Sequence, residues 1–393
     1  MSKLERLIQQ YCPDGVEYVK LDSVANICRG TRVVKSQLSD KGYPVYQNCL
    51  TPMGYFERSN CNAGITFVIC GGAAGNVGYT DVECWAADDC EFIIGGHQVI
   101  NRYIYYYLMT KQNYLLSKVR KASIPRLSPS IIKDLEIPLP PLPVQEEIVR
   151  ILDAFTELQA ELQAELQKRK QQYNYYLDNL LNFKNINRGR CQAEVRWMKM
   201  SEVFEIRNGY TPSKAKKEFW EGGTIPWFRM EDIRQNGRIL SDSILHITPK
   251  GVKGKGLFKA NSFILATTAT IGEHALIIAD SLANQQFTNL LIRKSLENEL
   301  SVKYVYYYFY VIDEWCKANT NVSNFASVDM SKFYNLLIPI PSIAEQQRIV
   351  SILDRFDTLT TDLAQGLPAE IEKRRQQYEY YRDKLLTFKR KGA

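Results

Sequence analysis

The sequence is poor in the side chains that most often build metal and nucleophilic sites. It has three His, His97, His246 and His274, and none is spaced as a metal-binding pair. Nine Cys are present, but none lies in a Cys-x-x-Cys pair, and seven of them fall between Cys12 and Cys90. We interpret them as reduced thiols of a cytosolic protein, and we expect no metal site and no Ser-His-Asp or Cys-His catalytic set.

The motifs of enzymes that act on DNA or nucleotides are also missing. A methylase of adenine amino groups needs an acid-or-Asn–Pro–Pro–aromatic tetrapeptide, whereas the only Pro-Pro here is Pro140-Pro141, between two leucines. The segment 71–75 resembles a Gly-rich cofactor loop superficially, but it lies in a strand-turn-strand context, and 251–256 lacks the Lys-Ser/Thr ending of a P-loop. Asp14 and Glu17 are too close together for a nuclease motif. We therefore predict a chain without catalytic residues.

Long apolar runs are absent as well. No segment approaches the roughly 18 consecutive apolar residues of a membrane span, and the N-terminus has no apolar signal stretch, so we expect a soluble, cytoplasmic protein. The composition, 45% hydrophobic and 24% charged, is that of a folded chain, and 393 residues suggest two or three domains. The net charge of +7 is less than expected of a protein held to DNA by charge alone. The 24 Tyr suit interfaces and nucleic acid, although most should lie in the core.

Two blocks of the sequence occur twice. Residues 137–158 (IPLPPLPVQEEIVRILDAFTEL) match residues 338–359 (IPIPSIAEQQRIVSILDRFDTL). Residues 165–184 (ELQKRKQQYNYYLDNLLNFK) match residues 370–389 (EIEKRRQQYEYYRDKLLTFK). A region with only faint internal similarity precedes each pair of blocks. The chain is therefore a tandem duplication, in which one scaffold was kept twice while two variable regions diverged.

The shared blocks carry apolar residues at helical spacing, and Pro-rich segments mark their starts. A long helix with one apolar stripe is unstable alone, so we predict that the two copies pair as an antiparallel coiled coil. A bundle with an outside partner is the alternative. Gly366 and Pro368 interrupt the second copy, because a Pro in a helix interior kinks or breaks it. The residues predicted to form the coiled coil or to bind partners are Ile148, Leu152, Phe155, Leu158, Leu162, Tyr173, Ile349, Leu353, Phe356 and Tyr378.

The variable regions are predicted to be mixed α/β (α+β). Strand-like runs at 65–70, 91–94, 262–265, 275–278 and 289–292 are separated by Gly-rich turns, and each region ends in a helix, near 101–118 and 301–317. We expect two globular domains joined by two long antiparallel helices, with an internal pseudo-twofold repeat. The expected boundaries are 1–142 for the first globular domain, 143–186 for the central helix, 187–341 for the second globular domain and 342–393 for the distal helix.

Basic residues mix with polar and aromatic ones in the loops of both variable regions. Arg and Asn side chains read base edges, whereas Lys suits phosphates, so these clusters are candidate DNA contacts. Each cluster taken alone is more often a solvated surface, and their recurrence in both regions favours DNA binding. The candidates are Arg29, Arg32, Lys35, Lys118, Arg120, Lys121, Arg126, Arg207, Asn208, Tyr210, Lys214, Trp227, Arg229, Lys250, Lys253 and Lys255.

The whole chain resembles the specificity subunits of type I restriction-modification systems. The resemblance rests on the repeated Ile-Pro-x-Pro…Gln…Ile-Val-x-Ile-Leu-Asp-x-Phe and Lys-Arg-x-Gln-Gln-Tyr-x-Tyr-Tyr segments, on residues 12–18 (CPDGVEY) and on residues 223–227 (GTIPW). It implies two target recognition domains, joined by two conserved helices, that read double-stranded DNA. It also implies two modification subunits, which carry S-adenosylmethionine and methylate adenine, and restriction subunits, which use ATP and Mg²⁺. No cofactor is expected on this chain.

Two other functions remain open from the sequence. One is a subunit of a related bipartite restriction system that cuts on both sides of its site. The other is a coiled-coil scaffold that does not bind DNA.

Residues 156–167 consist of three tandem four-residue units, Thr-Glu-Leu-Gln followed by two copies of Ala-Glu-Leu-Gln. One unit adds about 6 Å to a helix and a net rotation of about 40°. We predict that this helix is a ruler for an unread spacer between two half-sites. The alternative is that the repeat is only a regular coiled-coil segment.

Overall fold

The computed structural model describes residues 2–183, 195–321, 326–361 and 365–392. It contains two compact units, which we treat separately: the first unit is Met1–Glu165 with Ala369–Ala393, and the second unit is Leu166–Pro368. The predicted domain boundary between 186 and 187 falls outside the described residues. The other predicted boundaries remain predictions. Among the described residues, no helix has the length and apolarity to cross a membrane.

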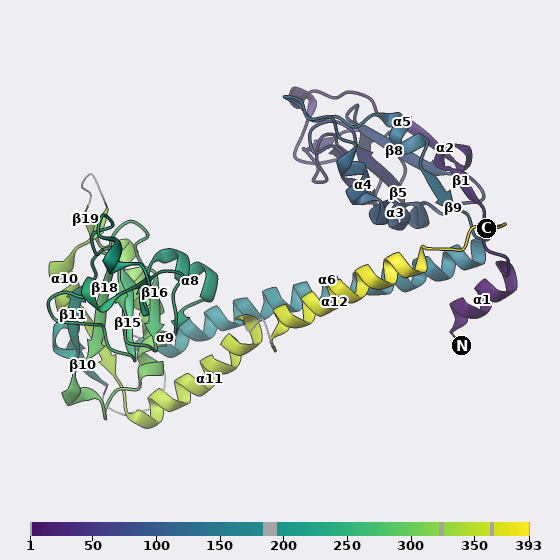
Figure 1. Ribbon diagram of the computed structural model, residues 1–393. Helices are drawn as coiled ribbons and strands as arrows, with labels where there is room; N and C mark the ends of the chain where they lie inside the picture. Colours follow the sequence, from purple (N-terminus) through teal and green to yellow (C-terminus); the bar gives the residue numbers. More distant parts are fainter. Residues whose placement is uncertain (1, 184–194, 322–325, 362–364, 393) are drawn as a thin grey trace. The chain divides into compact units, whose positions relative to one another are not determined.

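The first unit is built on a four-stranded antiparallel sheet in the order β2-β8-β5-β6; its two central strands, β8 and β5, are labelled in Figure 1. Its strands are β2 (Ala25–Arg29), β8 (Cys90–Gly95), β5 (Ile65–Ile69) and β6 (Val77–Thr80). All five residues of β5 are buried. One face of the strand is covered by α3 (Asn101–Thr110), which packs against β5, β6 and β8, and the side chains of the other face pack against Tyr46 and Ala86. The other elements are α1 (Lys3–Tyr11), β1 (Tyr18–Lys20), α2 (Leu21–Val24), η1 (Lys35–Gln37), β3 (Tyr43–Tyr46), β4 (Tyr55–Phe56), β7 (Trp85–Ala86), α4 (Gln112–Ser117), α5 (Pro129–Lys133) and β9 (Glu136–Pro138).

The second unit repeats this plan with one more strand, in the order β11-β18-β15-β16-β13. The strands are β11 (Phe204–Asn208), β18 (Phe287–Ile292), β15 (Ser262–Ala266), β16 (His274–Ile277) and β13 (Ile239–Leu240), and α9 (Val302–Ala318) packs against β15 and β16. The other elements are β10 (Arg196–Lys199), α7 (Met200–Val203), η3 (Lys217–Phe219), β12 (Ile225–Phe228), α8 (Met230–Asn236), β14 (His246–Ile247), η4 (Pro249–Gly251), β17 (Leu282–Ala283), η5 (Lys294–Leu296), β19 (Thr320–Asn321), β20 (Ser327–Val328), α10 (Met330–Asn335) and β21 (Leu337–Ile340).

Both units also contain the same smaller sheets. In each, a three-stranded sheet has one antiparallel and one parallel pairing, β4-β3-β7 in the first unit and β14-β12-β17 in the second. An antiparallel pair, β1-β9 or β10-β21, leads into the long helices. The predicted mixed α/β repeat and the five predicted strands are confirmed.

The long helices are α6 (Leu142–Leu181), α11 (Ile343–Thr361) and α12 (Leu367–Leu385). The first copy of the shared blocks is one continuous helix, whereas the second copy is divided around Gly366. Pro368 lies in the first turn of α12, where its missing N–H costs no helical hydrogen bond. The predicted interruption is therefore confirmed.

The two copies pair antiparallel within each unit. In the first unit, the ring of Phe155 on α6 stacks on Tyr381 of α12 with 5.6 Å between centroids. In the second unit, Phe356 on α11 stacks on Tyr176 of α6 with 5.1 Å between centroids. Phe155 and Phe356 occupy the same repeat position, as do Tyr176 and Tyr381, so the two units make the same contact with the roles of the two copies exchanged. Ile148, Leu152, Leu166, Tyr173, Ile349 and Leu353 are buried, while Leu158, Leu162 and Tyr378 are half-buried.

A buried glutamine fastens each globular part to its helix. Gln145 is fully buried; its Nε2 donates to the carbonyls of Gln98 and Pro140 at 2.9 and 2.7 Å, and its Oε1 accepts from the N–H of Ile100. Gln346 makes the corresponding three bonds, to Glu299, Pro341 and Ser301. Because the same glutamine makes the same three bonds in both copies, this contact is part of the scaffold.

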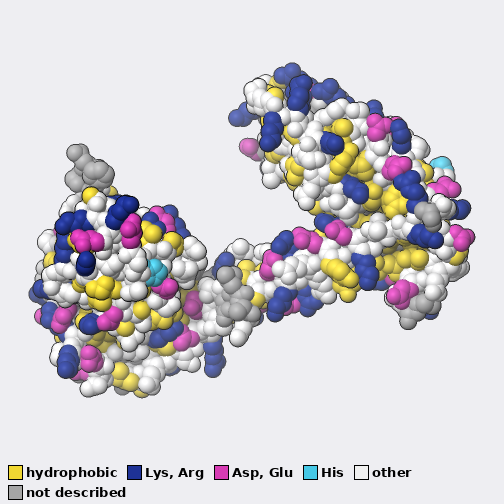
Figure 2. Space-filling view, in the orientation of Figure 1, with side chains coloured by type: hydrophobic (Ala, Val, Ile, Leu, Met, Phe, Trp, Pro, Cys, Tyr) yellow, Lys and Arg dark blue, Asp and Glu magenta, His cyan; other side chains and the backbone are white. Residues whose placement is uncertain are grey.

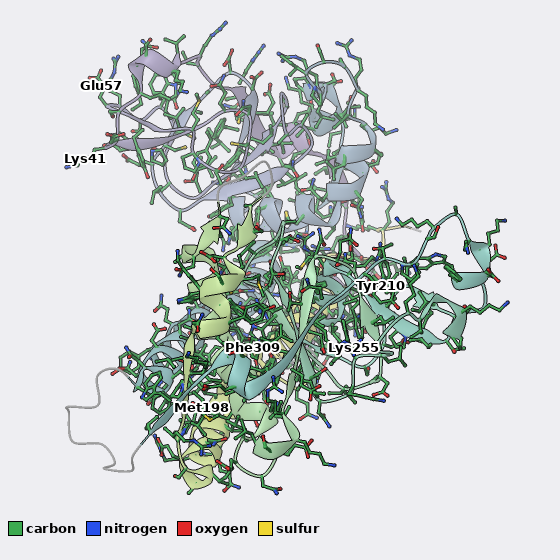
Figure 3. The ribbon with its side chains drawn as sticks, turned by 90° about the vertical axis from the view of Figure 1, so that its left-hand side faces the viewer. Lys41, Glu57, Met198, Tyr210, Lys255 and Phe309 are labelled. Carbon is green, nitrogen blue, oxygen red and sulfur yellow. The ribbon has the colours of Figure 1, made fainter. Side chains whose placement is uncertain are left out.

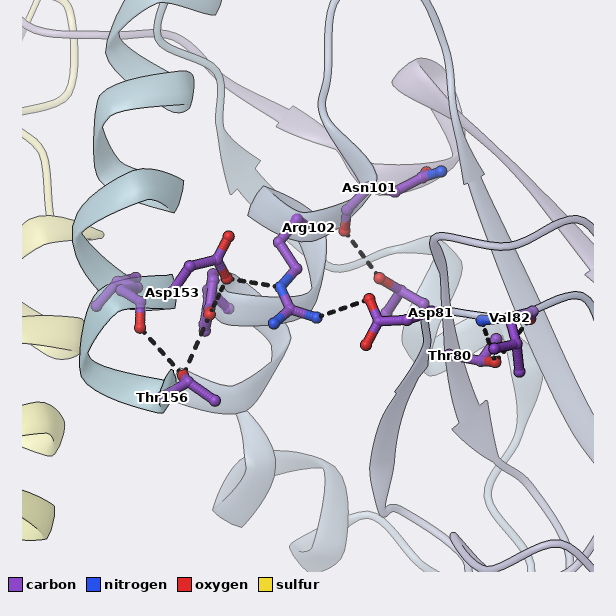
Figure 4. Close-up of polar contacts among 10 residues, drawn as sticks. Thr80, Asp81, Val82, Asn101, Arg102, Asp153 and Thr156 are labelled. Carbon is purple, nitrogen blue, oxygen red and sulfur yellow. Dashed lines mark hydrogen bonds and ion pairs between the residues drawn. The ribbon is translucent and has the colours of Figure 1, made fainter. Parts of the chain in front are cut away.

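A polar junction on α3 completes the attachment. Arg102 lies between Asp153 of α6, 2.8 Å away, and Asp81, 3.7 Å away, and Tyr106 donates to the same Asp153 oxygen (Figure 4). In the second unit, Lys303 and Tyr307 bind Asp354 of α11 in the same way.

Replacing Gln145 by Ala is expected to lower the free energy of unfolding of the first unit by about 2–4 kcal/mol. The reason is that three backbone groups lose their partners: the buried carbonyl of Pro140 and the partly buried groups of Gln98 and Ile100. Each group that water cannot reach then costs about 1–3 kcal/mol before relaxation. Chemical denaturation measures the change, and Gln163→Ala, on an exposed position of α6 within the first unit, is the matched control. Equal stability of the two variants would show that the bonds of Gln145 contribute nothing.

Candidate nucleic-acid interface

A cavity of about 380 Å³ in the first unit brings together four of the predicted basic residues. Arg29 comes from the end of β2, and Lys118, Arg120 and Arg126 come from the segment that follows α4. That segment folds back on itself, because Arg120 and Arg126 exchange backbone hydrogen bonds and Leu127 donates to the carbonyl of Cys70. Loops distant in sequence are thereby joined into one basic groove.

Contacts with the acidic and aromatic surroundings orient the cations of the groove. The Nε of Arg29 donates to the carbonyl of Asp88 at 2.7 Å, and Arg126 forms an ion pair with Asp89 at 3.2 Å. The Nζ of Lys118 lies 5.2 Å from the ring centroid of Tyr114. All four basic side chains remain exposed, so they are available to an anionic partner.

Two buried side chains that the sequence analysis did not select also line the groove. Glu91, on β8, has only 4% of its surface exposed, and burial raises the pKa of its carboxyl, against the opposing charges of Lys133 and Arg29. Burial likewise raises the pKa of the Cys70 thiol to about 12, which keeps it protonated and unreactive. In the sequence, the only sign that could have pointed to Glu91 is that a charged residue stands at the start of an apolar, strand-like run.

The other basic candidates of the first variable region lie outside this groove. Arg32, Lys35 and Lys121 are exposed, and none lines the cavity. In Figure 2, Lys and Arg side chains are spread over the visible face with acidic ones among them. The groove is therefore a local feature within a mixed surface.

In the second unit, the basic candidates gather around the loop 249–258. Arg207 donates to the carbonyls of Gly256 and Leu257, and its guanidinium lies 5.2 Å from the centroid of Phe258. Tyr210, labelled with Lys255 in Figure 3, donates to the carbonyl of Gly251 and accepts from the N–H of Lys253. These two side chains hold the loop, and the exposed lysines on it are Lys250, Lys253 and Lys255. Lys250 is paired with Glu218 at 3.1 Å, and Lys214 is also exposed.

Each of the other three candidates of the second unit makes a contact within the fold. Trp227 is 3% exposed and its Nε1 donates to the carbonyl of Tyr210, because it lies on the central strand of a three-stranded sheet. Trp227 is one of the candidate DNA contacts, and its ring is buried within the fold of the second unit. Asn208 accepts from Thr288 at 3.1 Å, and Arg229 is half-buried, with its Nε 3.8 Å from Glu231.

Nothing in the described segments gathers three or more His, Cys, Asp or Glu side chains into a possible metal site. The two units share one scaffold, but their loops carry different basic and polar side chains. This arrangement is suited to recognition.

The comparisons with known proteins agree on one family. The profile described as "Type I restriction modification DNA specificity domain" matches residues 13–169 and 193–373. The chain therefore belongs to the type I restriction-modification DNA specificity family, as the repeated motifs suggested.

Individual relatives match different shares of the chain. This chain is 53% identical over 204 residues to the EcoprrI specificity subunit of Escherichia coli. The match spans 50% of this chain and 51% of that protein, so it covers about half of each. The chain is 40% identical over 308 residues to the EcoR124I/EcoR124II specificity subunit of the same organism, which covers 74% of this chain and 72% of that protein. The crystal structure of a type I S subunit from M. genitalium has the same fold, with a TM-score of 0.60 at 16% identity over 95% of this chain and 96% of that one.

Proposed function

We propose that this chain is the DNA-reading specificity subunit of a type I restriction-modification complex and that it contributes no catalytic group. The observation that carries the proposal is a scaffold kept twice with different side chains at matched positions. Arg29 and Glu91 face each other across β2 and β8, whereas Asn208 and Thr288 face each other across β11 and β18. Two reading domains of one plan with different chemistry suit a target made of two unlike half-sites. The domains are 1–142 and 187–341, with the helices 143–186 and 342–393.

The target is accordingly asymmetric and bipartite, with an unread spacer. The test is selection of bound sequences from random double-stranded DNA by the assembled complex, together with methylome sequencing of the host with and without the gene. We expect one motif of two dissimilar halves. A palindromic or continuous target would contradict the proposal.

The partners are two modification subunits, which supply S-adenosylmethionine, and restriction subunits, which supply ATP and Mg²⁺. A duplicated exposed side chain supports two copies of one partner. Tyr175 on α6 and Tyr380 on α12 occupy the same repeat position and are 63% and 60% exposed. In both units, the tyrosine that follows packs against the opposite helix, so the exposed one is not needed for pairing.

The basic residues divide into phosphate and base contacts. Lys253→Ala is expected to weaken binding about equally on all sequences and to reduce the salt slope by about 1, because one phosphate contact is lost; Lys250→Ala should act likewise. Arg120→Ala is expected to relax specificity at one base pair by about 1–3 kcal/mol, and Arg229→Ala tests the same in the second unit. Titrations on target and random DNA separate the two effects. Unchanged binding in all four variants would remove these residues from the interface.

A further inference from the structure

Glu91 is an exception among the buried polar groups of the first unit. Its side chain lines the basic groove, and in the part of the chain that the structure describes it forms no side-chain hydrogen bond or ion pair. Its carboxylate oxygens are not among the buried polar atoms that lack a partner, so they remain open to the groove. A carboxylate with so little exposed surface is usually paired within the protein, and Glu91 is not. The fold of the first unit does not account for this carboxylate.

The matched position of the second unit shows what the fold itself requires there. Thr288 is 1% exposed, donates to Asn208 at 3.1 Å and lies 2.9 Å from the hydroxyl of Thr267. A small, fully hydrogen-bonded side chain therefore satisfies the scaffold. The first unit instead places an acid at this position, with Cys70 where the second unit has Thr267.

The surroundings restrict what the acid can bind. Arg29, Lys118, Arg120 and Arg126 line the same groove and attract the phosphates of DNA. A carboxylate repels phosphate, so its own partner must be a hydrogen-bond donor on a base. In the major groove, guanine presents only acceptors and thymine an acceptor and a methyl group. Adenine places its acceptor N7 beside its amino group, whereas cytosine presents the N4 amino group alone, and Glu and Asp are the side chains that accept from it.

We propose that Glu91 is a specificity-determining residue, which accepts a hydrogen bond from the amino group of a cytosine in the half-site read by the first variable region. The cations around it hold the backbone, and one of the arginines reaches the guanine of the same pair. This inference rests on the proposed DNA-reading function and assigns the chemistry of one reading position.

The test uses the assembled complex and selection of bound sequences with the wild-type chain, Glu91→Ala and Glu91→Gln. Glu91→Ala is expected to lose discrimination at one C·G pair of one half-site, by about 5- to 150-fold, the factor that corresponds to one mismatched pair. Glu91→Gln is expected to accept adenine at that position, because a glutamine amide pairs with adenine N6 and N7. The other half-site and the spacer should not change.

The control is Glu57→Gln, which makes the same chemical change on an exposed side chain outside the groove (Figure 3). Thermal unfolding of each variant separates misfolding from altered reading, and Glu91→Gln, nearly the same size as Glu, keeps the test valid if Glu91→Ala is unstable. An unchanged motif with Glu91→Gln, or a uniform change in affinity on all sequences, overturns the inference. If the wild-type complex selects no motif at all, the proposed function fails instead.

Discussion

Replacing both Tyr175 and Tyr380 by Ala is expected to weaken assembly with the modification subunits, so that little complex forms at concentrations near the wild-type Kd. An exposed Tyr that becomes buried in an interface contributes about 2 kcal/mol or more, which is about 30-fold in affinity at each site. The rings are placed alike in the two units: Tyr175 contacts Tyr176 edge-on at 5.7 Å, and Tyr380 contacts Tyr381 edge-on at 5.3 Å. The Nζ of Lys384 lies 5.6 Å from the ring centroid of Tyr380.

The single variants make this test sharper. Tyr175→Ala or Tyr380→Ala alone is expected to leave one binding site, so native mass spectrometry should detect a complex with one modification subunit in place of two. Tyr334→Ala is the control, because Tyr334 is also exposed but lies on α10, outside the repeated helices. Two subunits bound by the double variant would place the docking surface elsewhere.

The long helices were predictable because their signal is repeated and periodic. Leu152 and Leu353, or Phe155 and Phe356, recur at the same positions of a heptad-like stripe, and a stripe of this length has to be covered. Because the blocks are duplicated and the helices pair antiparallel, the first block of each copy was expected to contact the second block of the other copy, as Phe155 contacts Tyr381 and Phe356 contacts Tyr176. The central strands were predictable for a related reason: β5 and β15 are buried on both faces and are short, nearly continuous apolar runs.

The groove was only half predictable. The sequence shows which loops are basic, but not which side chains turn outward, and this separates Arg120, which lines the groove, from Arg207, which holds a loop. Trp227 was selected as an aromatic neighbour of the basic residue Arg229, but the pairing of β12 with strands on both sides buries it. Glu91 was missed because one charge at the edge of an apolar run is unremarkable until the strand order places it beside Arg29.

The symmetry of the contacts helps to separate scaffold from reading residues. Contacts made twice, such as those of Gln145 and Gln346, belong to the scaffold, since both copies need them to hold a globular part on its helix. Positions that differ between the copies, such as Glu91 and Thr288, are free of that requirement. Variation between the half-sites should therefore map to the second group, as proposed for Glu91.

Deleting residues 160–163 is expected to give the complex a new target with both half-sites unchanged and a spacer one base pair shorter. These residues form one complete four-residue unit in the middle of the continuous helix α6, to which both units contribute residues. Removing them shortens the helix by about 6 Å and rotates it by about 40° net, close to the roughly 35° by which B-DNA turns per base pair. The 6 Å exceeds the roughly 3.4 Å rise per base pair, so bending of protein or DNA must absorb the difference.

The same deletion is expected to lower the affinity for the original target about 1000-fold. With the old spacer, one reading domain would meet bases that are out of register, and several mismatched pairs cost about 1–3 kcal/mol each. Glu161→Ala is the control, because it changes the same unit but keeps the length of the helix, so its target should be that of the wild type. Selection of bound sequences with the wild-type chain, the deletion variant and Glu161→Ala measures the spacer of each. An unchanged spacer with normal binding would show that the repeated units only maintain helix pairing and do not measure the spacer.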